Sequence, residues 1–180
     1  MKQPWRNRWL PVIGFVLVLY AFVPFGRGVV VALRQNHILG SVVTLVLFVT
    51  MAAGVYHVVF NVRLSDRVAF AALAVLAAAT GALVLGLEVP EERIHFLEYG
   101  VLAVLARRAL DGLWRPAGVY LGAWLLTSAA GWGDELIQGV VPSRVYDMRD
   151  VVVNSVAALV ALAADEILNN RLGWRSRRSE

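Results

Sequence analysis

Six apolar runs dominate the chain, and each is long enough, or nearly long enough, to cross a lipid bilayer as a helix. The runs cover residues 9–25, 38–61, 68–87, 91–109, 117–139 and 150–168. A helix needs about 20 residues to cross the hydrocarbon core of a bilayer. Because backbone polar groups in lipid must be satisfied within the protein, spanning segments are helices or closed barrels. The sequence therefore predicts an all-α fold, a polytopic integral membrane helical bundle with about six transmembrane helices.

The composition supports a membrane protein and argues against a nucleic-acid partner. Hydrophobic residues make up 59% of the 180 residues and charged residues 17%, whereas soluble domains carry about 25% charged residues. Arginines at the ends of the apolar runs produce the net charge of +4, and they do not form the basic face that nucleic-acid binding requires. The chain has no cysteine, which excludes disulfides and thiolate metal ligands. The partner that the composition indicates is the lipid bilayer.

Lysine and arginine are distributed unequally between the two sides of the predicted bundle. Counted on alternate sides of the six runs, 12 lie on the side of both termini and 5 on the other side. Cytoplasmic loops of multi-pass proteins carry the excess of these residues. We therefore expect a multi-pass protein of the cell membrane with both termini in the cytoplasm. AFVPF follows Tyr20 where a signal peptide would have a small-residue cleavage site, so the first helix should be retained.

Polar residues interrupt the fourth apolar run and the end of the fifth. Spacings of three and four residues place His95, Glu98 and Tyr99 on one face of a helix. In the segment DELIQ, Asp134 and Glu135 precede Gln138 by four and three residues, so these side chains share one broad face. Both groups fall at the predicted extracytoplasmic end of the bundle. Carboxylates at such positions are usually paired and often functional.

The connection to the last helix carries a third group of polar residues. Asp147 can cap the start of that helix. Asp150 and Asn154 lie four residues apart and continue down one face into the apolar run, which capping does not explain. Arg144 is the nearest cation to the adjacent carboxylates of the preceding helix. We expect these residues to meet the other two polar groups at the ends of three consecutive helices.

The segments HFLEYGVL, DELIQ and PSRVYDMRDVVVN, in this order, resemble the VanZ-like family of small bacterial membrane proteins. The resemblance covers about residues 91–160. It implies a binding site formed by His95, Glu98, Tyr99, Asp134, Glu135, Gln138, Arg144, Asp147, Asp150 and Asn154. Two positions depart from the family pattern: Glu92 replaces a common lysine, and Ala157 replaces a common glycine. The first change makes the site more acidic, and the second loosens a helix contact.

This resemblance divides the chain into three regions. Residues 1–90 are expected to form a scaffold of three transmembrane segments, residues 91–168 a VanZ-like core of three helices, and residues 169–180 a basic cytoplasmic tail. Asp165 and Glu166 lie near the cytoplasmic end of the last helix, where we expect them to be solvated.

The resemblance implies a fold and a location more directly than a reaction, and three functions stay open. The family is named for a protein that contributes to teicoplanin resistance. The first function is therefore binding or shielding of a cell-envelope component, such as a lipid-linked or peptidoglycan-related ligand, or of a glycopeptide antibiotic. An arginine held between acids suits this role, because a guanidinium offers paired donors to carboxylate or phosphate groups.

The second function is a metal-dependent membrane enzyme that acts on a lipid-linked envelope substrate. Glu98, Asp134, Glu135 and Asp150 could bind a divalent cation through carboxylate oxygens. No HExxH, GxSxG or similar motif supports catalysis, and no other cofactor is indicated. The third is a purely structural polar network, in which Arg144 pairs with Asp150 and Glu135 to hold three helices in register.

Overall fold

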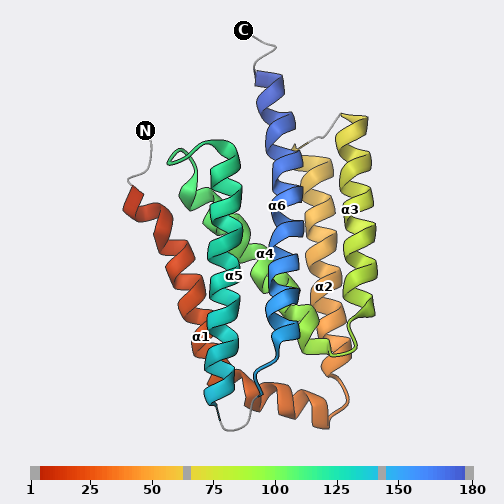
Figure 1. Cartoon of the computed structure of the whole chain (residues 1–180). Coiled ribbons are helices and arrows are strands. Elements are labelled where there is room, and N and C mark those ends of the chain that lie inside the picture. The colour runs from red at the N-terminus through yellow and green to blue at the C-terminus, as the bar shows by residue number, and fades with distance from the viewer. Residues whose placement is uncertain (1–4, 63–65, 142–144, 177–180) are drawn as a thin grey trace.

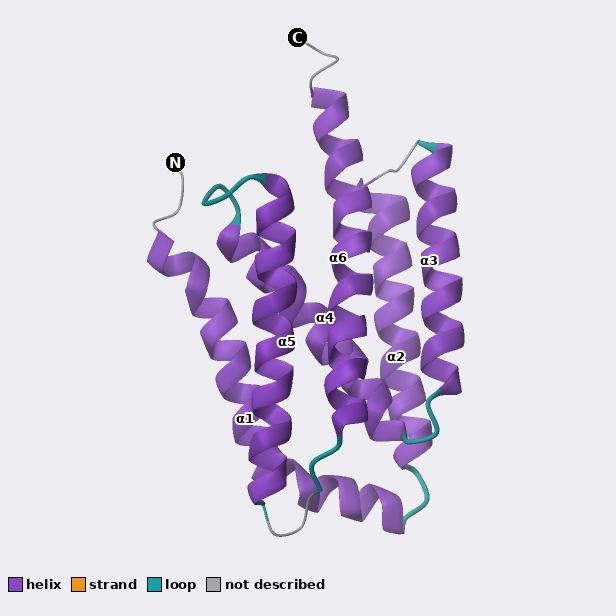
Figure 2. Cartoon of the chain, in the orientation of Figure 1, coloured by secondary structure: helices purple, strands orange, loops and turns teal. Residues whose placement is uncertain are grey.

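Helices account for nearly all of residues 5–62, 66–141 and 145–176, which a computed structural model of the protein describes. In chain order they are α1 (Trp5–Gln35), α2 (Leu39–Tyr56), the short π-helical extension η1 (His57–Val62), α3 (Arg67–Gly86), α4 (Pro90–Leu110), α5 (Pro116–Val140) and α6 (Met148–Ser176). The described residues contain no strand (Figure 2). The predicted all-α class is confirmed.

The helices α4, α5 and α6 pack against one another and form the centre of the bundle (Figure 1). Small side chains allow this close packing, as Ala103, Ala106, Ala123 and Ala158 are all buried where the three helices meet. Helix α1 packs against α4 and α5, and it contributes Val12 to the core. Helices α2 and α3 lie outside this group and expose most of their apolar side chains, as lipid-facing helices do.

Four of the helices are long and apolar enough to cross a membrane. The candidate spans are Asn7–Pro24, Leu39–Phe60, Arg67–Gly86 and Met148–Asn169. Helices α4 and α5 are long enough, with 21 and 25 residues, but neither contains a stretch apolar enough to be counted with these spans. Their sides face neighbouring helices over much of their length, so they need less apolar surface than a lipid-exposed helix. The structure thus supports four spans, and the predicted count of six is not confirmed.

The connections place the polar motifs at one end of the bundle. The described beginning of α1 and the end of α6 lie at the opposite end, together with the turn between α4 and α5 (Figure 1). The last part of α1, beyond the span Asn7–Pro24, runs crosswise beneath the end that carries the α3–α4 and α5–α6 connections. Proline removes a backbone donor and commonly bends a helix, which accounts for this change of direction near Pro24. Which end faces the cytoplasm stays a prediction of the arginine distribution.

Candidate polar site at the α4, α5 and α6 helix ends

One face of α5 carries the acids of the candidate site into the bundle. The buried residues of this helix recur every three or four positions: Val119, Ala123, Thr127, Gly131, Asp134, Glu135 and Gln138. This is the spacing of a single helical face. This face is apolar at the start of α5 and polar toward its end. Because the whole face is buried, the acids lie between helices rather than against lipid.

Glu135 links α5 to the connection that follows it. One of its carboxylate oxygens accepts a hydrogen bond of 3.0 Å from the side-chain amide of Gln138, and the other accepts one of 3.0 Å from the backbone N–H of Asp147. The same Gln138 amide donates to Asp134 at 3.2 Å. Gln138 therefore bridges two adjacent carboxylates as a shared donor, which offsets part of their repulsion.

The beginning of α6 is tied to α4 as well as to α5. The carboxylate of Asp147 accepts a hydrogen bond of 2.8 Å from the backbone N–H of Arg149, so the predicted helix cap is confirmed. The Arg149 guanidinium lies 3.6 Å from the Glu92 carboxylate, near the start of α4. The Arg149 side chain is 52% exposed and that of Glu92 only 7%. We call this pair the rim of the site. Its Arg149 guanidinium is accessible to solvent, and its Glu92 carboxylate is buried.

The predicted polar face of α4 points toward α5. The His95 ring nitrogen Nδ1 lies 3.5 Å from the Glu98 carboxylate, and the His95 ring stacks on Tyr99 with ring centroids 6.1 Å apart. Tyr99 is fully buried, and its hydroxyl faces the Asp134 carboxylate. Glu98 is also close enough to Asp134 for the two charges to interact. The structure thus brings the α4 and α5 residues together.

Asn154 of α6 completes the convergence of the three helices. Its side chain is fully buried and packs on Gly131 of α5. A Cβ atom at Gly131 would lie 2.9 Å from Asn154 Cβ and 3.3 Å from the Tyr99 ring, closer than side chains normally approach. Asp150, one turn before Asn154, interacts electrostatically with Glu135 and Glu92. Arg144 lies outside the described residues, so the predicted guanidinium clamp stays a prediction.

The model of the VanZ/LLP1 family matches residues 2–168. The chain belongs to the VanZ/LLP1 family. The match extends the resemblance beyond the motifs of α4, α5 and α6 to α1, α2 and α3. Comparisons with curated proteins and with solved structures found no significant match.

Three residues at this site were not among the ten that the sequence predicted to form it. Glu92 precedes His95 and Tyr99 by three and seven residues, so helical spacing alone could have placed it on their face. Thr127 precedes Asp134 by seven residues on the buried face of α5, which is a similar signal. Tyr20 of α1 donates a hydrogen bond of 2.8 Å to the Ala130 carbonyl, 110 positions away, and no local pattern indicates such a contact.

Replacing Gly131 by alanine should destabilise the VanZ/LLP1 fold by about 1–3 kcal/mol, because the new Cβ overpacks the contact with Asn154 and Tyr99. The measurement is the thermal unfolding of purified protein in detergent. Gly81→Ala is the matched control, since no atom lies within 4 Å of a Cβ built at Gly81. Alanine there should instead stabilise α3, by up to about 1 kcal/mol. Equal unfolding temperatures for the two variants would contradict the close contact at Gly131.

The described part of the site offers no arrangement of three His, Asp or Glu side chains that could hold a metal ion. Of the four carboxylates that the sequence suggested for a divalent cation, Glu135 is engaged by Gln138 and Asp147, and Glu98 lies beside His95. The geometry of these residues therefore does not add support to the metal-dependent alternative.

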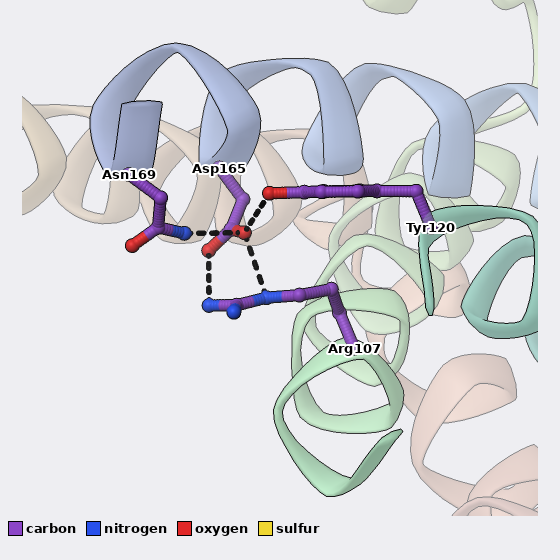
Figure 3. Close-up of polar contacts among 4 residues, drawn as sticks. All are labelled: Arg107, Tyr120, Asp165 and Asn169. Carbon is purple, nitrogen blue, oxygen red and sulfur yellow. Dashed lines mark hydrogen bonds and ion pairs between the residues drawn. The ribbon is translucent and has the colours of Figure 1, made fainter. Parts of the chain in front are cut away.

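A second polar cluster lies near the end of α4 and the start of α5, where both meet the later part of α6. Figure 3 shows its four residues. Arg107 of α4 contacts Asp165 of α6 through Nε at 2.8 Å and Nη2 at 3.3 Å. Asp165 also accepts hydrogen bonds from the Tyr120 hydroxyl at 3.2 Å and the Asn169 amide at 2.7 Å. The expectation that Asp165 is solvated was wrong, because the residue is buried and pairs with groups from two other helices.

Proposed function

We propose that this VanZ/LLP1 protein binds or shields a cell-envelope component, or a glycopeptide antibiotic, through the polar ends of α4, α5 and α6. The proposal includes a six-span topology in which these ends face the extracytoplasmic side. A ligand would then approach from the outer leaflet or beyond. The predicted excess of lysine and arginine on the side of the termini supports this orientation.

The observation that carries the proposal is the excess of acid at this end of the bundle. The described residues of the site include the carboxylates Glu92, Glu98, Asp134, Glu135, Asp147 and Asp150. The cationic side chains described among them are Arg149 and, when protonated, His95. Arg93 lies nearby, but its guanidinium donates two hydrogen bonds to the Leu87 carbonyl. The site therefore offers more acceptors than its own described cations can engage.

This charge pattern favours a ligand that presents amines and hydroxyls, as sugars and peptides do. Carboxylates form their strongest hydrogen bonds with charged donors. The half-exposed Arg149 adds one accessible cation at the rim, suited to a carboxylate or phosphate of the same ligand. An envelope precursor or a glycopeptide combines both kinds of group, whereas a plain anion would be repelled by the surrounding acids.

A purely structural network is the second candidate, and the Glu135 contacts favour it specifically. This buried carboxylate joins α5 to the start of α6 through the Asp147 backbone. A network of this kind specifies how helices pack even where it adds little net stability. The structural role predicts that losing any member of the site lowers stability, whereas the binding role predicts that rim residues affect binding alone.

The test measures binding of teicoplanin, and separately of a lipid-linked peptidoglycan precursor, to purified protein in lipid nanodiscs. We expect saturable binding of one of them, weakened at least tenfold by Arg149→Gln at an unchanged unfolding temperature. Arg108→Gln is the matched control, because Arg108 is exposed on the same bundle but at the other end. If neither probe binds, or if Arg149→Gln binds normally, the binding proposal is wrong. Loss of stability together with binding would support the structural network.

A further inference from the structure

Three buried polar side chains lie between the helices, deeper than the rim of the candidate site. Tyr99 of α4, Thr127 of α5 and Asn154 of α6 are each 0% exposed. The hydroxyl of Thr127 and both amide atoms of Asn154 have no hydrogen-bond partner among the described residues, while the Tyr99 hydroxyl faces the Asp134 carboxylate. Buried polar atoms in folded proteins are normally paired, so each of these exceptions calls for a physical explanation.

Thr127 of α5 differs from Thr50 of α2 and Thr80 of α3. Thr50 and Thr80 each donate to the backbone carbonyl four residues earlier, at 2.8 Å and 2.7 Å. This is the usual way in which a helical threonine satisfies its hydroxyl in an apolar environment. Thr127 sits inside α5 and makes no such bond. Its oxygen therefore stays available to a group located between the helices.

Gly131 of α5 lies at the centre of a group of four polar side chains, which adds Asp134 to Tyr99, Thr127 and Asn154. Thr127 and Asp134 lie on the same buried face of α5, four residues before and three residues after this glycine. Asn154 and Tyr99 approach Gly131 directly from α6 and α4, and the Tyr99 hydroxyl faces Asp134. One carboxylate, two hydroxyls and one side-chain amide thus come from three helices to the neighbourhood of this glycine. Only the missing side chain of Gly131 makes this convergence possible.

We infer that Tyr99, Thr127, Asp134 and Asn154 form a binding site for a small monovalent cation such as Na⁺. Hard cations prefer oxygen ligands of this kind. A single carboxylate among neutral oxygens matches a single positive charge, whereas a divalent ion usually takes several carboxylates. Ionisable residues between membrane helices commonly mark the position of an ion. The inference does not require the envelope ligand, since the rim residues Glu92 and Arg149 take no part in it.

A bound water molecule is the competing explanation for the same polar atoms. Water also satisfies hydroxyls and amides in buried polar sites. It carries no charge, however, so its binding does not depend on which salt is present. Stabilisation that depends on the identity of the cation at constant ionic strength therefore separates the two.

The experiment follows the unfolding temperature of the purified full chain in detergent while NaCl replaces N-methyl-D-glucamine chloride at constant ionic strength. We expect a saturable rise in unfolding temperature with Na⁺. Thr127→Val, which keeps the shape of the side chain and removes its hydroxyl, should raise the half-saturating Na⁺ concentration at least tenfold. Tyr99→Phe should raise it as well. Thr80→Val is the control and should leave the midpoint unchanged, because the Thr80 hydroxyl bonds within its own helix.

Two outcomes would overturn the cation site: equal unfolding temperatures in both salts, or a Thr127→Val midpoint equal to that of the wild type. Should Tyr99→Phe fail to fold, the isosteric Thr127→Val variant still decides the question. Repeating the teicoplanin and precursor binding assays without Na⁺ separates this inference from the proposed function. Ligand binding that persists there, together with no Na⁺ effect on unfolding, would refute the cation site alone.

Discussion

Asp165→Ala is expected to lower the free energy of unfolding by about 3–5 kcal/mol, the usual cost of removing one partner from a buried ion pair. Asp165 receives donors from Arg107, Tyr120 and Asn169 (Figure 3). Alanine would leave the Arg107 guanidinium, whose side chain is 14% exposed, without its carboxylate between three helices. The measurement is the unfolding of purified protein in mixed micelles by increasing SDS, monitored by circular dichroism.

Two further variants show whether the loss comes from the unpaired charge. Arg108→Ala removes an exposed arginine next to Arg107 and should change stability by less than about 0.5 kcal/mol. The double variant Arg107→Met with Asp165→Leu removes both charges and should recover most of the stability, because a buried ion pair can often be replaced by apolar residues of similar volume. A double variant as unstable as Asp165→Ala would show that the hydrogen bonds to Tyr120 and Asn169 matter more than the ion pair.

The second large effect is expected at Glu135. Glu135→Ala should destabilise the protein by about 3 kcal/mol, since it removes two hydrogen bonds to a carboxylate, each worth about 1.5–3 kcal/mol. The Asp147 backbone N–H would lose its acceptor, and the connection between α5 and α6 would lose its link to α5. Hydrogen exchange should therefore speed up at the start of α6, around residues 147–150, while the far end of α6 keeps its protection.

Glu88→Ala provides the control for this prediction. Glu88 is an exposed acid at the same end of the bundle, so its loss should leave both the unfolding transition and the exchange of residues 147–150 unchanged. If Glu135→Ala retains normal stability and normal exchange in this segment, the carboxylate does not hold the connection. The connection between α5 and α6 would then be held by other contacts.

Much of the fold could be predicted from the sequence because it depends on local periodicity. The long apolar runs require helices in lipid, whatever their neighbours are. Spacings of three and four residues likewise placed Asp134, Glu135 and Gln138 on a single face of α5, and the structure places all three in the buried part of that helix. The Asp147 cap is similarly local, and it is confirmed by its bond to the Arg149 backbone.

The predictions that were wrong or not confirmed depend on which other helices pack against a given helix. Asp165 was expected to be solvated from its position near a helix end, yet Arg107, 58 positions away, provides its partner. The predicted spans α4 and α5 contain no stretch as apolar as the four supported spans, and other helices cover much of their surface. Hydropathy describes a segment on its own and cannot show which sides of it are covered.

The amino-acid sequence by itself determined that the chain forms apolar helices, that α4, α5 and α6 carry polar faces, and that the chain belongs to the VanZ/LLP1 family. Only the tertiary structure decided that Tyr99, Thr127 and Asn154 meet at Gly131, and that Glu92 faces Arg149. The physical reason is that helix formation depends on neighbours a few positions away along the chain. The pairing of helices depends on side-chain shapes and charges that come together only after each helix has formed and packed.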